Sequence, residues 1–413
     1  MKDSTNPAGQ PATRTRRLHT ERPFWAATPR ISVPAQRSWD AGEVDVVVIG
    51  TGISGALMAD ALADGRRRVL VIDRRTPVRG STLASTAMIQ HEIDLPLFEL
   101  SRQIGRAKAE RAWRRSVRAV EDLVARIGAL GIDCAMAPKR ALYLAGDSYG
   151  SRALAMEAEA RAAAGIAHEL LSAEALRDRF GLERTAAILS SASASANPAQ
   201  MTAGLLAAAV ARGAEVISPV TITDLDEAGE RAVLATAEGR LILARHAVFC
   251  TGYEFLPMMQ SPAHRITSTW ALASEPGVAR PDWLDDMLVW EGSDPYLYFR
   301  SAKDGRIIAG GEDEDSPDGW ADAERMPRKL ARIVEKLGDL TGMKVAPAYG
   351  WAAPFGNTTD GLPIIDRVPG MARTHAVMGF GGNGITYSMI AAQIVAARIA
   401  GTADPDEDLF AFR

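Results

Sequence analysis

The sequence predicts an α/β fold that begins with a dinucleotide-binding unit. Residues 46–49 form an unbroken apolar run, as expected of a parallel strand buried on both faces. A glycine-rich turn at residues 50–55 follows and opens a predicted helix at residues 56–62. A second apolar run, residues 69–72, ends in Asp73. This order of strand, glycine turn, helix and strand is typical of a Rossmann-type domain.

The three glycines of this turn, at G-x-G-x-x-G spacing, have separate physical tasks. Gly50 allows the tight turn, Gly52 lets backbone approach a pyrophosphate, and Gly55 lets the helix lie close on the strand. The helix N-terminus supplies free N–H groups and a positive dipole end. Asp73 is placed to accept hydrogen bonds from a ribose hydroxyl. A flexible turn in an ordinary α/β domain is the alternative, but the motif meets its required context at every point.

Length and composition set limits on the class of protein. The chain has 413 residues, which favours two domains, and its 47% hydrophobic and 24% charged residues are ordinary for a globular protein. A net charge of −4 gives no electrostatic reason to expect nucleic acid as a partner. The six histidines and the cysteines Cys134 and Cys250 form no metal-like cluster, so no metal site is expected. Two distant cysteines suit a reducing, cytoplasmic location, and no apolar run approaches transmembrane length.

Residues 1–43 are expected to form a partly disordered N-terminal extension. Residues 1–17 are polar and rich in Pro, Ser, Thr and Arg, which is typical of disorder. The pair at residues 16–17 resembles a twin-arginine signal, but no apolar segment follows it, so export is not expected. Phe24 and Trp25 interrupt the polar stretch, and we expect these two aromatic residues to pack on the folded body.

The middle of the chain alternates between predicted helices and short strands. Residues 79–93 are rich in Ser, Thr and Ala and are expected to form a loop and a short helix near the cofactor. Apolar residues at helical spacing predict helices within residues 95–130, at 151–163, from 172 onward and at 199–212. Short strands are expected at residues 141–144, 216–217, 221–225, 232–236, 241–243 and 247–250. The last strand runs into Thr251-Gly252, a second sign of a dinucleotide domain.

The C-terminal part combines a β-rich region with another glycine turn. Strands are expected at residues 267–273, 287–291, 296–300 and 306–310, and a charged amphipathic helix at 320–340. A strand at residues 376–380 then opens into a glycine turn at residues 381–386, and a helix follows at 387–399. A glycine turn that opens a helix has an anion-binding geometry, although a turn needed only for packing is the alternative.

Together these segments resemble the FAD-dependent oxidoreductases of the D-amino acid oxidase family, which includes glycine oxidase, sarcosine oxidase and γ-glutamylputrescine oxidase. The most specific segments are DVVVIGTGISG, Thr251-Gly252, and TTDGLPIID with GFGGNGIT. The resemblance spans nearly the whole chain from about Phe24 and implies two domains, each discontinuous in sequence. The FAD-binding domain would combine residues 44–95, 166–262 and 355–413. An α+β substrate domain with an antiparallel sheet would take residues 96–165 and 263–354.

The resemblance also implies which residues bind FAD. Arg74 would lie beside the adenosine, Thr82 would contact the phosphates, and Ile222 would offer a backbone contact to adenine. The turn at residues 382–386 would lie at the pyrimidine edge of the flavin, where a helix N-terminus stabilises the negative charge of the reduced ring. The expected cofactor-binding residues are Gly50, Gly52, Ile53, Ser54, Gly55, Asp73, Arg74, Ser81, Thr82, Ile222, Thr251, Gly252, Gly381, Gly382, Asn383, Gly384, Ile385 and Thr386.

Departures from the family pattern narrow the expected chemistry. Glycine oxidase-like members place an arginine before the proline of the C-terminal motif to hold a substrate carboxylate, and Ala353 occupies this position here. Simple α-amino acids are therefore expected to be poor substrates, unless Arg300 or another cation replaces that clamp. No cysteine lies near Gly356, and Ala84 stands where related dehydrogenases have a flavin-linking histidine, so FAD is expected to be non-covalent.

The implied reaction is oxidation of a C–N bond in a small amine or amino acid by hydride transfer to flavin, giving an imine that hydrolyses. Oxygen or another acceptor would reoxidise the flavin. An NAD(P)H-dependent flavin reductase is an alternative, although it would need a second dinucleotide motif. A non-catalytic flavin-binding subunit is another alternative.

Candidate catalytic residues come from the β-rich region. Tyr296, Tyr298 and Arg300 alternate along one predicted strand and should face the same side. Trp351 is a candidate wall of the substrate pocket. Ordinary core packing is the alternative for the tyrosines and the tryptophan. Residues 312–313, Glu-Asp, end a predicted strand and would either bind an ammonium group or be solvated.

Overall fold

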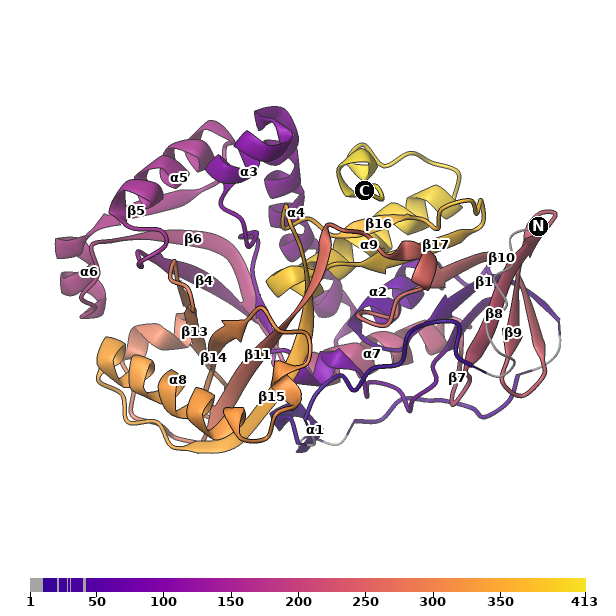
Figure 1. Cartoon of the computed structure of the whole chain (residues 1–413), viewed down its shortest axis with the longest axis horizontal. Coiled ribbons are helices and arrows are strands. Elements are labelled where there is room, and N and C mark those ends of the chain that lie inside the picture. The colour runs from indigo at the N-terminus through magenta and orange to yellow at the C-terminus, as the bar shows by residue number, and fades with distance from the viewer. Residues whose placement is uncertain (1–9, 21, 28, 30, 40–41) are drawn as a thin grey trace.

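The computed structural model describes residues 10–20, 22–27, 29, 31–39 and 42–413, and its strands form two large sheets (Figure 1). The central strands of the first sheet are parallel, in the order β17, β10, β1, β2 and β7, and β16 pairs antiparallel with β17 at the edge. An antiparallel meander of β8, β9 and β10 continues this sheet. The bounds are β1 Glu43–Ile49, β2 Val69–Ile72, β7 Glu215–Ile217, β8 Ile222–Ala228, β9 Arg231–Thr236, β10 Leu241–Phe249, β16 Ile364–Arg367 and β17 Thr374–Met378.

The first sheet is buried on both faces, as the apolar run at its centre predicts. Val46 and Val48 of β1 pack into one apolar cluster, and Val47 and Ile49 pack into another. The first cluster includes residues of the helices, and the second includes residues of the β8–β9 meander. Burial on both faces holds the end of β1 in a fixed position.

The second sheet is mainly antiparallel and runs in the order β15, β11, β14, β13, β12, β4, β6 and β3, with β5 paired to β6. Its bounds are β3 Met88–Ile89, β4 Ala137–Leu144, β5 His168–Ser172, β6 Ala186–Ser195, β11 His264–Ser274, β12 Met287–Glu291, β13 Leu297–Ser301, β14 Ile307–Glu314 and β15 Pro347–Thr358. Pairing of β5 with β6 places residues 168–172 and 186–195 in this sheet, whereas the sequence-based division assigned them to the FAD-binding domain.

Helices cover both sheets. Their bounds are α1 Phe24–Ala27, α2 Ile53–Leu62, α3 Leu97–Ile104, α4 Arg106–Leu130, α5 Ser151–Ala163, α6 Ala173–Phe180, α7 Pro198–Ala211, α8 Arg325–Thr341 and α9 Gly384–Ile399. Helix α2 packs against both α7 and α9, beside the first sheet (Figure 1). Helix α8 packs on β11, β14 and β15 of the second sheet. Contact of α2 with α9 brings the two glycine turns of the sequence together.

The N-terminal segment is folded onto the body over the residues that the structure describes. Residues 10–20, which we name the N-terminal strap, bond to distant parts of the chain: Ala12 N–H donates to Ile222 O, and Thr20 N–H donates to Ala352 O. The expectation of disorder is therefore wrong for residues 10–17, and residues 1–9 lie outside the described residues. Phe24 and Trp25 are buried, which confirms that they pack on the body.

No helix among the described residues is long and apolar enough to cross a membrane. The same residues contain no cluster of His, Cys, Asp and Glu suited to a metal ion.

Candidate active site

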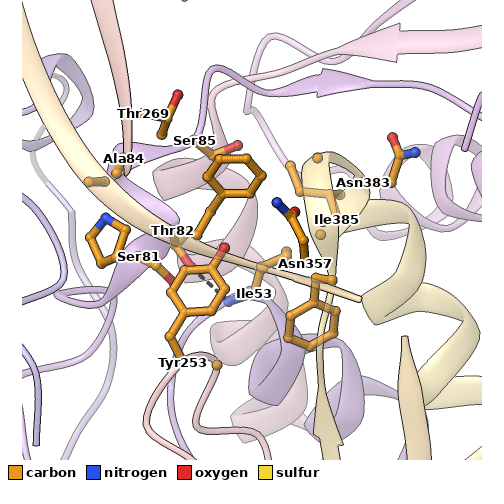
Figure 2. A pocket seen from close by; sticks show the side chains of 18 of the residues that line it. Ile53, Ser81, Thr82, Ala84, Ser85, Tyr253, Thr269, Asn357, Asn383 and Ile385 are labelled. Atoms are coloured by element: carbon orange, nitrogen blue, oxygen red, sulfur yellow. Dashed lines mark hydrogen bonds between the residues drawn. The ribbon is translucent and has the colours of Figure 1, made fainter. Parts of the chain in front are cut away.

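The N-terminal glycine turn has no room for a side chain at Gly50 or Gly55. Gly50 has φ +118°, and a Cβ there would lie 2.3 Å from the carbonyl oxygen of Cys250. A Cβ on Gly55 would lie 1.8 Å from the carbonyl oxygen of Gly50, so α2 packs directly against the end of β1. The helix begins at Ile53, whose N–H donates to Thr82 Oγ1 at 3.0 Å (Figure 2). Gly52, the residue before the helix, has no side chain that could cap it, and the first turn borders a cavity of about 550 Å³.

Asp73, at the end of β2, is held in a fixed orientation beside this turn. Its Oδ2 accepts hydrogen bonds from Thr51 N at 2.8 Å and from Thr51 Oγ1 at 2.7 Å. Its Oδ1 accepts a hydrogen bond from Arg75 N at 2.8 Å. Asp73 and Arg75 both line the cavity. The carboxylate is therefore positioned before any ligand binds.

The C-terminal glycine turn is tied to residues 90–94. Gly382 N donates to Asp94 Oδ2 at 2.8 Å, and Thr386 Oγ1 donates to Gln90 O at 2.9 Å. The Asn383 side chain donates to Glu92 O. Because Asp94 uses the N–H of Gly382, that group is not free for the flavin contact expected of this turn. Burial raises the pKa of Asp94, while the Gly382 hydrogen bond acts in the opposite direction.

Both turns border the same cavity. Figure 2 shows Ile53 and Thr82 from one turn region, and Asn383 and Ile385 from the other, around one space. Ser54 Oγ lies 2.7 Å from Ser388 Oγ, which joins α2 directly to α9. The expected cofactor-binding residues that line the cavity are Gly50, Gly52, Ile53, Ser54, Asp73, Arg74, Ser81, Thr82, Ile222, Thr251, Gly252, Gly381, Gly382, Asn383, Gly384, Ile385 and Thr386. Gly55 lies behind them, between α2 and β1.

Residues of the second sheet line another part of the cavity. Tyr296, Tyr298 and Asp313 border it, together with Thr269 and Ala353. Tyr296 Oη donates to Asp313 Oδ2 at 2.8 Å, and the two tyrosine rings lie 5.6 Å apart. Burial raises the pKa of Asp313 to about 6, although hydrogen bonds from the Thr269 and Tyr296 hydroxyls act in the opposite direction. This part of the cavity offers the Asp313 carboxylate beside an aromatic wall.

Two predicted catalytic residues lie away from the cavity lining. Arg300 is 2% exposed, and its guanidinium donates to the carbonyl oxygens of Thr86, Ala196 and Ser301 at 2.9–3.1 Å. Trp351 is 1% exposed, and its Nε1 donates to Ala84 O. These contacts give both residues a structural role, and Arg300 is not available to replace the missing carboxylate clamp.

Other cavity residues escaped the sequence analysis. Thr13 and Leu18 of the N-terminal strap line the cavity, as do Asp94, Tyr253 and Asn357. The strap carried no sequence signal because its composition is that of a disordered tail. Asp94 lies one residue beyond the segment expected to be near the cofactor, residues 79–93, and its acidic character was the available signal.

Comparisons with known proteins identify a matching family and chains of similar fold. The family described as FAD dependent oxidoreductase (DAO) matches residues 45–398. The probable oxidoreductase OrdL of Haemophilus influenzae is 24% identical over 86% of this chain and 83% of its own length. Glycine oxidase from Geobacillus kaustophilus has a similar fold, with a TM-score of 0.73, 19% identity, and coverage of 90% of this chain and 99% of its own. L-proline dehydrogenase from P. horikoshii also gives a TM-score of 0.73, at 19% identity, over 89% of this chain and 96% of its own.

Proposed function

The chain belongs to the family of FAD-dependent oxidoreductases, and on this premise we propose that it oxidises a C–N bond of a small amine to an imine that hydrolyses in water. One observation carries the proposal. The two glycine turns meet at one cavity, and the same cavity continues to a wall formed by Tyr296, Tyr298 and Asp313. A flavin site and a site for a small cationic molecule are therefore adjacent.

The residues around the two turns fit FAD. The close backbone packing at Gly50 and Gly55 suits a diphosphate, and so does the N-terminus of α2, where Gly52 has no capping side chain. Asp73 is oriented by Thr51 and Arg75 to accept hydrogen bonds from a ribose. We propose that adenosine lies beside Arg74 and Ile222, and that the N-terminus of α9 borders the flavin ring.

The chain's own contribution to the reaction is binding and orientation. Bound FAD supplies a hydride acceptor. The positive end of the α9 dipole, at residues 383–386, favours negative charge in that part of the cavity. Tyr296 and Tyr298 would hold the substrate carbon chain against the cofactor. Ala353 offers no charged group to a carboxylate, so the chain lacks the usual means of binding an α-amino acid at this position.

An anaerobic panel of amines and α-amino acids tests the proposed function. Small amines are expected to bleach the yellow flavin of the purified protein, whereas glycine and D-alanine should do so at least about tenfold more slowly, because a missing charged contact is worth about 1.5–3 kcal/mol. Flavin absorbance is the measurement, and repetition with oxygen detects peroxide. Bleaching by NADPH but by no amine would instead support the flavin reductase, and a protein that refuses FAD would exclude both enzymes.

The N-terminal strap is expected to slow the release of FAD. Arg74 donates to Thr13 and Thr15, and Arg75 forms a two-point ion pair with Glu254, which also accepts a hydrogen bond from Arg16 N. Removal of residues 1–20 should therefore open the proposed adenosine end and speed FAD dissociation at least about tenfold, the equivalent of about 1.4 kcal/mol. Flavin fluorescence after dilution measures the rate.

A chain shortened by residues 1–9 alone is the reference for this experiment, because it keeps the whole strap. Equal FAD dissociation rates from the two shortened chains would show that the strap does not cover the cofactor.

A further inference from the structure

The charges that line the cavity are distributed unequally. Among the described residues that line it, Arg74 and Arg75 are the only Lys, Arg or His side chains, and both lie near Asp73 at the proposed adenosine end. The part walled by Tyr296, Tyr298 and Asp313 therefore has no cationic lining residue. Such a surface repels a substrate carboxylate and attracts a substrate cation.

Asp313 and Asp94 differ from the glutamates of the lining, because neither aspartate forms an ion pair among the described residues and burial raises the pKa of both. The three glutamates are neutralised by arginines, in the ion pairs Glu92–Arg161, Glu254–Arg75 and Glu291–Arg184. The Asp94 carboxylate accepts a hydrogen bond from Gly382 N at the C-terminal turn. Tyr296 donates to Oδ2 of Asp313, whereas Oδ1 has no hydrogen-bond partner among the described residues. A carboxylate out of bulk water without a cation is unfavourable by several kcal/mol unless a ligand supplies the missing charge.

The backbone of β14 directs this carboxylate into the cavity. Gly311 has φ +137° and Glu312 has φ +59°, which interrupts the regular alternation of the strand. Glu312 is 1% exposed and forms ion pairs with Lys329 and Lys336 of α8. The cations of α8 thus neutralise Glu312 on one side of the sheet, and Asp313 remains on the cavity side.

A carboxylate at this place suits an amino group other than the one that reacts. Hydride leaves the carbon beside an unprotonated amine, whereas a nearby carboxylate stabilises the protonated form and so raises the amine pKa. Asp313 would therefore inhibit oxidation if it held the reacting amine. It would assist binding if it held a second, permanently protonated group, and the faces of Tyr296 and Tyr298 also attract cations.

We propose, on the basis of the proposed function, that the preferred substrate carries a second ammonium group, which binds Asp313 beside Tyr296 and Tyr298. The substrate class is then a linear diamine or polyamine without a carboxylate. Asp313 is the residue that determines specificity for the second charge.

The test compares the holoenzyme on a series of linear diamines with the linear monoamines of the same length. In the natural protein, kcat/KM for the best diamine should exceed that of its monoamine by about 10- to 100-fold, as expected for a charged hydrogen bond. Asp313→Asn keeps a polar partner for Tyr296 but removes the charge, and it should abolish this preference by raising KM for the diamine much more than KM for the monoamine.

Two further variants control for folding and for general charge. Asp315→Asn removes the same charge two residues away, from an exposed side chain outside the cavity lining, and should leave the diamine preference unchanged. Asp313→Glu keeps the charge on a longer side chain and should restore the preference with a shift toward shorter diamines.

The pH profile supplies a readout that a merely structural residue would not affect. Asp313 faces Tyr296, Tyr298 and Thr269. The charge of Asp94 raises the pKa of Asp313, and the charge of Lys329 lowers it. Because its pKa is raised to about 6, it loses its charge as the pH falls through that value. KM for diamines should therefore rise below about pH 6 relative to KM for monoamines, and Asp313→Asn should remove the difference.

The outcomes separate the two proposals. Equal kcat/KM values for monoamines and diamines in the natural protein would overturn the role of Asp313 and leave amine oxidation intact. An Asp313→Asn variant that lowers kcat/KM equally for both would do the same. Failure of every amine in the series to bleach the flavin would overturn both.

Discussion

Gly55→Ala is expected to yield a protein that does not retain FAD. The added Cβ would lie 1.8 Å from the carbonyl oxygen of Gly50 and 2.8 Å from its carbonyl carbon. These are backbone atoms, so α2 itself must move away from β1. Because α2 is bonded to α9 through Ser54 and Ser388, the movement would also disturb the C-terminal turn. We expect the free energy of FAD binding to weaken by about 3 kcal/mol or more, so the FAD affinity should fall at least roughly 100-fold.

The ratio of flavin to protein absorbance after purification measures the effect, and FAD titration of the apoprotein gives the affinity. Gly128→Ala in α4 is the matched control, because a Cβ there meets nothing within 4 Å. Alanine is favoured over glycine in a helix by about 1 kcal/mol, so this variant should keep its FAD and be slightly more stable. A Gly55→Ala protein with a full complement of FAD would contradict the contact between α2 and β1.

The two glycine turns could be predicted from the sequence because their requirements are local. After a strand, the turn needs a residue with positive φ, and the helix must then pack closely on the strand. Both requirements select glycine, and they do so at fixed spacings along the chain. The structure places Gly50 and Gly55 in these roles. That the two turns share one cavity followed from the resemblance to a family and not from either motif.

Features that depend on distant partners escaped the sequence analysis. The sequence of β6 is rich in Ser and Ala and shows no alternation of polar and apolar residues. The segment is a strand because β4 and β5 pair with its two edges. The strap resembles a disordered tail, but Arg75 and Glu254, far along the chain, supply partners for its backbone. Composition cannot reveal such partners.

The β-rich region shows how far alternation can be used. It predicted that Tyr296 and Tyr298 share a face, and both line the cavity. It also placed Arg300 on that face. Alternation does not show how deeply a side chain is buried, however, and the Arg300 guanidinium is surrounded by backbone carbonyl groups. The orientation of Asp313 depends on the positive φ of Glu312, which alternation alone does not indicate.

The second large effect is expected from Arg161→Met, in a buried ion cluster behind the C-terminal turn. Arg161 is fully buried, donates to Glu157 at 2.7 Å and to Glu92 at 3.2 Å, and lies over the ring of Trp113. Methionine would leave two buried carboxylates without a cation, so the free energy of unfolding should fall by about 3–5 kcal/mol. Urea denaturation of the holoprotein measures this change.

Two matched variants show whether unpaired charge is the cause. Adding Glu92→Gln and Glu157→Gln to Arg161→Met removes both carboxylates and should recover part of the lost stability. Arg177→Met breaks an exposed pair with Glu183 and should have no measurable effect. Because Glu92 O accepts the hydrogen bond of Asn383, FAD affinity should fall and recover together with stability. A stable Arg161→Met protein with weakened FAD binding would separate the two, and would mean that the cluster positions the cofactor turn without supporting the fold.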